Sequence, residues 1–298
     1  MAYFEFYSTN PIMFALSCGV LGLLIGSFLN VVVYRLPIML EQEWREQCVE
    51  FLEDDGKQKL DLPEKKAEYK NFNLVTPFSH CPKCQHKIRF WENIPVFSYF
   101  LLGRKCYQCK TPISFRYPFV ELLSGVLSFT VALHFGFGEQ AAAALLLTWV
   151  LIALSFIDYD TQLLPDVITI PMVWVGLILS IFLVYVDPVT SIIGATAGYL
   201  SLWIVFQVFR LITGKEGMGF GDFKLLALLG AWLGWKMLPL IILLSSFAGA
   251  FIGIGLIILK KQNKEKPIPF GPYLAIAGWI ALLYGENLID YYFHISIS

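Results

Sequence analysis

The sequence carries little charge. Lys, Arg, Asp and Glu make up 15% of its 298 residues, whereas 57% of the residues are hydrophobic. The apolar runs are far longer than a soluble core helix requires, so we interpret the chain as an integral membrane protein. No internal repeat and no low-complexity tract is present. The basic residues form no stripe interleaved with aromatic residues, and nucleic-acid binding is therefore not expected.

The start of the chain lacks the features of a cleaved signal. Residues 1–10 have no basic n-region and include Glu5, and no small-residue cleavage site follows the first apolar run. We therefore expect this run to be retained as a helix. A glycine fingerprint of the dinucleotide-binding type is also missing, so no motif indicates a nucleotide-like cofactor site.

The long apolar runs predict an all-α polytopic membrane protein with about eight transmembrane helices, since about 20 mostly apolar residues cross the hydrocarbon of a bilayer. The predicted spans are residues 11–36, 117–136, 140–157, 166–186, 190–211, 218–235, 237–259 and 270–290. In the predicted span at 218–235, the part that follows Asp222 is short for a full crossing of the membrane. A re-entrant segment there would move the basic loop at 260–266 to the other side, so we expect a full crossing that begins before Asp222.

The basic residues predict the orientation of the chain. Alternating spans place 21 of the 22 Lys and Arg residues on one side of the membrane and leave only Lys236 opposite. The positive-inside rule makes that side the cytoplasm and puts both termini outside.

We predict a first helix at 1–36, a small cytoplasmic zinc-binding domain at 37–116 and a seven-helix membrane core at 117–298. Residues 41–73 are rich in mixed charge, which is typical of a solvated helical face.

Four of the six cysteines form two C-x2-C pairs with 21 residues between them, at Cys81, Cys84, Cys106 and Cys109. Two such knuckles can place four thiolates around a zinc ion. Disulfides are the alternative, but they are rare in the reducing cytoplasm; a redox or empty site is a third interpretation. His80 and His86 could replace a cysteine, although we expect them to be bystanders.

Two acids lie at one predicted depth, near the cytoplasmic edge. Asp158 ends the third span, and Asp222 follows Gly219 and Gly221 at the start of the sixth. If the two carboxylates meet, like charges cannot both ionise and they share one proton, which is the arrangement of an aspartic protease. The glycines suit a tight turn and the close approach of an extended substrate. For Asp166, after Pro165, we expect a helix N-cap; Asp160 is either a solvated acid or a residue that supports the pair.

With these residues in view, the chain resembles the bacterial type IV prepilin peptidases over nearly its whole length. The matching segments are Gly26-Ser27-Phe28-Leu29-Asn30-Val31-Val32, Arg35-Leu36-Pro37, both cysteine knuckles, Arg116-Tyr117-Pro118 with Glu121, Ile157-Asp158 through Leu164-Pro165-Asp166, Gly219-Phe220-Gly221-Asp222 and Pro269-Phe270-Gly271-Pro272-Tyr273. Several of these segments lie outside the acidic pair, so the resemblance does not rest on the short G-x-G-D motif.

The resemblance implies an aspartic endopeptidase of the bacterial inner membrane with type IV prepilins or type II secretion pseudopilins as substrates. Cleavage would follow a leader glycine, and the new N-terminal residue would be methylated with S-adenosylmethionine as donor. The family's catalytic aspartates match Asp158 and Asp222, and its zinc ligands match the four knuckle cysteines. Family members often carry Gly-Lys before the third cysteine. The resemblance links this stretch to methyl transfer; here Arg104 and Lys105 precede the cysteine, so these two residues are the candidates for the cofactor site.

Two other classes of function fit parts of the pattern. Intramembrane acids also occur in ion-coupled transporters, but such proteins often show inverted repeats, and the two halves of this chain show no such symmetry. Presenilin-like intramembrane proteases share the G-x-G-D motif, but the cysteine knuckles and the Gly-Ser-Phe-Leu-Asn segment argue against that class.

Overall fold

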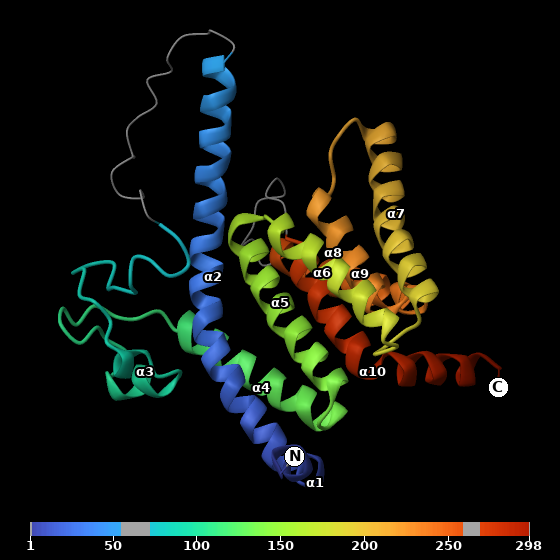
Figure 1. Ribbon diagram of the computed structural model, residues 1–298. Coiled ribbons are helices and arrows are strands. Elements are labelled where there is room, and N and C mark those ends of the chain that lie inside the picture. Colours follow the sequence, from blue (N-terminus) through green and yellow to red (C-terminus); the bar gives the residue numbers. More distant parts are fainter. Residues whose placement is uncertain (1, 55–71, 259–268, 298) are drawn as a thin grey trace. The chain divides into compact units, whose positions relative to one another are not determined.

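The structure is a computed structural model that describes residues 2–54, 72–258 and 269–297 (Figure 1). Within these ranges it is helical, and the only strand-like pairings are isolated bridges in the cysteine knuckles. The elements are α1 (Ala2–Thr9), α2 (Pro11–Asp54), η1 (Phe90–Asn93), α3 (Phe97–Leu101), α4 (Arg116–Phe135), α5 (Glu139–Thr161), α6 (Asp166–Ile181), α7 (Pro188–Thr213), α8 (Phe220–Leu233), η2 (Trp235–Met237), α9 (Leu238–Ile258) and α10 (Gly271–Ile297).

Each of the eight predicted spans contains a helix, and in the described ranges five helical segments are long and apolar enough to cross a membrane. These segments are Pro11–Leu52, Arg116–Phe135, Glu139–Thr161, Pro188–Thr213 and Trp235–Gly255. The shorter α6 is also apolar. The all-α membrane fold predicted from the sequence is thus confirmed.

The first helix is longer than its predicted span. Residue 36 does not end it, because α2 continues through Pro37 to Asp54. A proline inside a helix removes one backbone hydrogen bond, but the charged residues that follow are good helix formers. The mixed-charge stretch is therefore helical at its start, as expected; its residues 55–71 lie outside the described part of the chain.

The contacts divide the chain into two compact units, Ser17–Phe129 and Met1–Leu16 with Thr130–Ser298. In the first unit, α2 and α4 pack through small residues. A Cβ atom on Gly26 would lie 2.7 Å from the Cα of Glu121, and one on Gly22 would overlap the Ser128 hydroxyl. Small residues let membrane helices approach closely in this way.

In the second unit, α8 is the innermost helix and packs against α6, α7 and α10. Nearly every residue from Asp222 to Leu233 is buried, as expected for a helix that is apolar on all sides. Its 14 residues give α8 a length of about 21 Å. This helix, which lies in the sixth predicted span, is therefore shorter than the hydrocarbon thickness of a typical bilayer. Close packing with α7 is possible because Gly194 and Gly230 face each other, and a Cβ on either would overlap the other's carbonyl.

Candidate functional site

Asp158 lies in the last turn of α5, where its side chain is buried although it is acidic. The helix ends directly afterwards, since Gln162 adopts the left-handed conformation and its amide donates to the Asp158 carbonyl at 2.8 Å. The carboxylate accepts a hydrogen bond from the backbone amide of Gly271, at 2.9 Å from Oδ2. Because Gly271 is the first residue of α10, the helix dipole adds to the stabilisation of negative charge there.

Asp222 lies in the first turn of α8, and its side chain is also buried. Gly219 is the N-cap residue of this helix, in an extended conformation, and its carbonyl accepts the Asp222 amide at 3.2 Å. Leu164 lies beside both acids, because it packs against Gly221, next to Asp222, and against Gly271, whose amide binds Asp158. The structure therefore brings together the two acids that the sequence predicted to lie at one depth.

Leu164 and two glycines pack tightly around the acidic pair. A Cβ on Gly221 would lie 2.7 Å from the Leu164 Cβ, and one on Gly271 would lie 2.7 Å from the Asp158 Oδ2. Gly219, in contrast, has room for a side chain. Gly221 is thus explained by its contact with Leu164. Gly271 was not among the predicted site residues, although it lies within one of the segments that match the family.

Asp166 does not have the predicted N-cap role. Pro165 is the N-cap residue of α6, and it provides no side-chain cap. The Asp166 carboxylate accepts hydrogen bonds from Lys224 Nζ at 2.6 and 2.7 Å. The N-cap prediction was wrong because α6 begins at Asp166 itself, which leaves Pro165 at the N-cap position, and because a cation on α8 offers the carboxylate a stronger partner. The ion pair joins α6 to the first turns of α8, next to Asp222.

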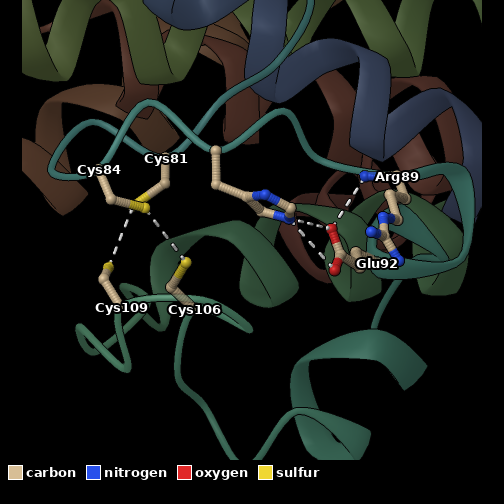
Figure 2. A network of polar contacts seen from close by, with 7 residues as sticks. Cys81, Cys84, Arg89, Glu92, Cys106 and Cys109 are labelled. Atoms are coloured by element: carbon tan, nitrogen blue, oxygen red, sulfur yellow. Dashed lines mark hydrogen bonds and ion pairs between the residues drawn. The ribbon is translucent and has the colours of Figure 1, made fainter.

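The four predicted cysteines of the other unit form one cluster, in which all four sulfur atoms lie within 4.8 Å of one another. Cys81 and Cys109 are 3.7 Å apart, and Cys84 and Cys106 are 3.9 Å apart (Figure 2). Four sulfurs at about 2.3 Å from a tetrahedral zinc ion would be separated by about 3.8 Å. The donor set and its spacing therefore fit a tetrahedral metal ion.

The two knuckles have the same backbone arrangement. The amides of Cys81 and Cys106 donate to the carbonyls of His86 and Thr111 at 2.9 and 2.8 Å. In each knuckle the residue after the second cysteine, Gln85 or Lys110, has a positive φ angle, of 59° or 56°. The bridges His80–Lys87 and Lys105–Pro112 close the two turns. Each C-x2-C segment is therefore a local unit that aims its two thiols in one direction.

Neighbouring groups support the cluster without joining it. His86 Nε2 lies 3.2 Å from Oε2 of the buried Glu92, which also accepts the Arg89 amide at 2.9 Å (Figure 2). The Thr111 hydroxyl lies 3.2 Å from the Cys109 sulfur. Hydrogen bonding to Thr111 lowers the pKa of the Cys109 thiol to about 6, which favours the thiolate that binds metal. His86 is thus a bystander to the sulfur cluster, as expected.

The side chains of Arg104 and Lys105 are exposed. Their backbones are part of the second knuckle, since the Arg104 carbonyl accepts the Ile113 amide at 2.8 Å. Arg104, which stands where the family pattern has glycine, and Lys105 thus have a structural place beside the third cysteine.

Comparisons with known proteins cover both units. Residues 20–135 match the bacterial peptidase A24 N-terminal domain, and residues 145–254 match the type IV leader peptidase family. The chain is 54% identical to the prepilin leader peptidase/N-methyltransferase of Stutzerimonas stutzeri, over 97% of this chain and 96% of that protein. The Pseudomonas aeruginosa protein of the same name is 53% identical over 98% of each chain, and that of Aeromonas hydrophila is 54% identical over 91% of each. No solved structure matches the chain.

Proposed function

Because the chain belongs to the type IV leader peptidase family, we propose that it is a prepilin leader peptidase and N-methyltransferase. Its substrates would be type IV prepilins or type II secretion pseudopilins, cleaved after the leader glycine and methylated at the new N-terminal residue. The family assignment argues against the two alternative classes, the ion-coupled transporters and the presenilin-like proteases. It also indicates a multi-pass protein of the inner membrane.

The observation that carries the peptidase proposal is the buried carboxylate pair. Asp158 and Asp222 come from different helices, are both buried, and lie around the same leucine, Leu164. Two carboxylates that meet in a buried site share one proton, because like charges cannot both ionise there. We therefore propose Asp158 and Asp222 as the catalytic residues of an aspartic peptidase.

The hydrogen bond from Gly271 distinguishes the roles of the two acids. It stabilises negative charge on Asp158, so we assign Asp158 as the base and Asp222 as the acid in the first step. Asp158 takes a proton from water while the water oxygen bonds to the scissile carbonyl carbon, and Asp222 gives its proton to the carbonyl oxygen. The carbon–nitrogen bond then breaks as Asp158 returns its proton to the leaving nitrogen and Asp222 recovers a proton from the collapsing diol.

Zinc is the metal that we propose for Cys81, Cys84, Cys106 and Cys109. Four thiolates in a closed set are typical of a structural zinc site, which has no open position for water or substrate. When bound, the metal would supply folding energy to a segment with little apolar core of its own. None of the steps of peptide hydrolysis requires it.

No motif in the sequence indicates a site for S-adenosylmethionine. A hollow of about 610 Å³ lies between α7, η2 and α9, but apolar residues such as Leu238, Ile242 and Phe247 dominate its lining. Such a surface has no acid to hold a ribose or a positively charged sulfonium. The methylation proposal therefore rests on the family relationship, and Arg104 and Lys105 are the residues proposed for the cofactor site.

The orientation in the membrane is a further part of the proposal. The distribution of Lys and Arg supports both termini outside and the cysteine knuckles in the cytoplasm. A prepilin with a basic leader and an apolar segment would then insert with its leader in the cytoplasm. We retain the predicted division into residues 1–36, 37–116 and 117–298 as a functional one, with the peptidase pair in the last part.

Mass spectrometry of a candidate prepilin, incubated with the purified protein and S-adenosylmethionine, tests the proposal. Asp158→Asn and Asp222→Asn should each lower the cleavage rate by about 100-fold or more, because an amide cannot exchange the proton. Asp290→Asn is the matched control, since it changes an exposed aspartate on α10 and should leave the rate unchanged. Normal cleavage by either variant of the pair would refute the catalytic assignment.

A further inference from the structure

The cysteine-knuckle segment exposes an unusual amount of aromatic surface. In α3, Phe97, Phe100 and Leu101 are 64%, 58% and 81% exposed, whereas Tyr99 is buried. The exposed residues are spaced at i, i+3 and i+4, so they share one helical face. Phe90 in the preceding η1 is 81% exposed. We call this set of four exposed residues the η1–α3 face.

The charge around this face has one sign. From Phe72 to Arg116 the only acidic residue is Glu92, and its side chain is buried against His86. The same segment contains seven basic residues: Lys83, Lys87, Arg89, Arg104, Lys105, Lys110 and Arg116. Four thiolates around a divalent cation would together add two negative charges, and the net charge of the segment would still be positive. A surface of this charge is complementary to anionic headgroups.

The packing of α2 against α4 fixes a depth scale in this unit. The two helices run antiparallel, with Gly26 against the Cα of Glu121 and Asn30 Nδ2 donating to the Tyr117 carbonyl at 3.1 Å. The 20 residues of α4 span about 30 Å, which equals the hydrocarbon thickness of a typical bilayer. Arg116, at the start of α4, therefore marks one edge of the hydrocarbon.

A hydrogen bond places the η1–α3 face on this scale. The Val96 amide, directly before α3, donates to Glu121 Oε2 at 2.8 Å. Helical side chains lean toward the N-terminus, so Val96 lies between the levels of Glu121 and Arg116. That interval is at the membrane edge or inside it.

Val96 has a φ angle of 62°, which is an outlier for a β-branched residue. Its conformation turns the chain between η1 and α3, and the buried Glu121 carboxylate holds it there. The depth of α3 is thus set by a specific contact with α4.

We propose that the η1–α3 face is an interfacial membrane anchor, seated in the anionic lipid leaflet of the same membrane that α2 and α4 cross. Its aromatic residues lie among the acyl chains next to the headgroups, and Arg104 and Lys105, which follow α3, contact the phosphates. Apolar burial and attraction to anionic lipid act together in such anchors. The knuckle domain then rests on the bilayer surface. This inference does not depend on the peptidase assignment.

The full-length protein in lipid nanodiscs tests the anchor directly. A fluorescent amino acid is placed at position 97, or at position 51 as the matched control. Phe51 is also a well-exposed aromatic residue, 70% exposed, but it lies far along the charged extension of α2. Bilayers of phosphatidylcholine and phosphatidylglycerol with brominated acyl chains should quench the fluorescence at position 97 by about half or more and leave position 51 nearly unchanged.

Two further arms keep the test decisive. Changing Arg104→Gln together with Lys105→Gln should reduce the quenching at position 97 in anionic bilayers only. Slow hydrogen exchange of the Cys81 and Cys106 amides, which are hydrogen-bonded in the knuckles, reports that each labelled protein is folded. Absence of quenching at position 97 in a folded protein would overturn the proposal. So would shielding of this position from aqueous iodide without lipid quenching, because the face would then be covered by protein.

Discussion

The sulfur cluster and the carboxylate pair differ in how far along the chain their parts lie from one another. Each cysteine knuckle closes within a few residues through backbone hydrogen bonds, such as that from the Cys81 amide to the His86 carbonyl at 2.9 Å. The acidic pair takes Asp158 from the end of α5, Asp222 from the start of α8 and the Gly271 amide from α10, a partner 113 residues from Asp158. The metal site is therefore mostly local chemistry, whereas the acidic site exists only when three helices pack correctly.

The largest effect is expected at the local site. Cys106→Ser removes one of four thiolates, so the metal content should fall from about one zinc per chain to nearly none, with loss of knuckle structure. Cys48→Ser is the control, because Cys48 is exposed and lies outside the cluster. Elemental analysis and hydrogen exchange measure the two quantities. A full equivalent of zinc in the Cys106→Ser protein would show that the cluster is not the metal site.

The long-range site should be sensitive to a single methyl group. Gly271→Ala would place a Cβ 2.7 Å from the Asp158 Oδ2, so the carboxylate must move. Displacement of a catalytic group by about 1 Å can lower a rate by about 100-fold. Gly255→Ala on α9 is the matched control, since a Cβ there meets nothing within 4 Å. Equal cleavage rates for the two alanine variants would contradict the assigned contact.

An effect of intermediate size is expected on stability, from glycine substitutions where α2 packs against α4 away from both sites. Gly22→Ala would bring a Cβ within 2.6 Å of the Ser124 carbonyl, whereas on Gly19 the nearest atom is at an ordinary 3.4 Å. Overpacking of this kind costs about 1–3 kcal/mol. Thermal unfolding in detergent should therefore separate Gly22→Ala from Gly19→Ala. A smaller loss for Gly22→Ala than for Gly19→Ala would mean that α2 and α4 do not approach as described.

The smallest expected effect is the loss of stability when an ion pair is broken, and it is compared for one pair between two helices and one pair within a single helix. Asp166→Asn breaks the pair with Lys224, which is partly exposed, and should lower the free energy of unfolding by about 0.2–1 kcal/mol. Glu41→Gln breaks the exposed pair with Arg45 within one helix and should cost about 0.5 kcal/mol or less. A double-mutant cycle of Asp166→Asn with Lys224→Met measures the coupling. No coupling would remove the ion pair as a link between α6 and α8.

Two predictions differ from the structure for different reasons. The first helix was predicted to end at residue 36, yet α2 continues through Pro37 to Asp54, because the charged residues that follow are good helix formers. The N-cap role predicted for Asp166 is wrong because Lys224 on another helix binds this carboxylate. In the second case a tertiary partner outweighed the local signal.

The sequence by itself determined the helical membrane fold and the cysteine cluster. Apolar run length fixes which segments form membrane helices, and C-x2-C spacing fixes the knuckle turns, because both depend on interactions within a few residues. Only the tertiary structure decided that Gly271 donates to Asp158, that Leu164 fills the space at Gly221, and that Glu121 holds Val96. These contacts depend on which faces of distant helices meet, and packing settles that choice.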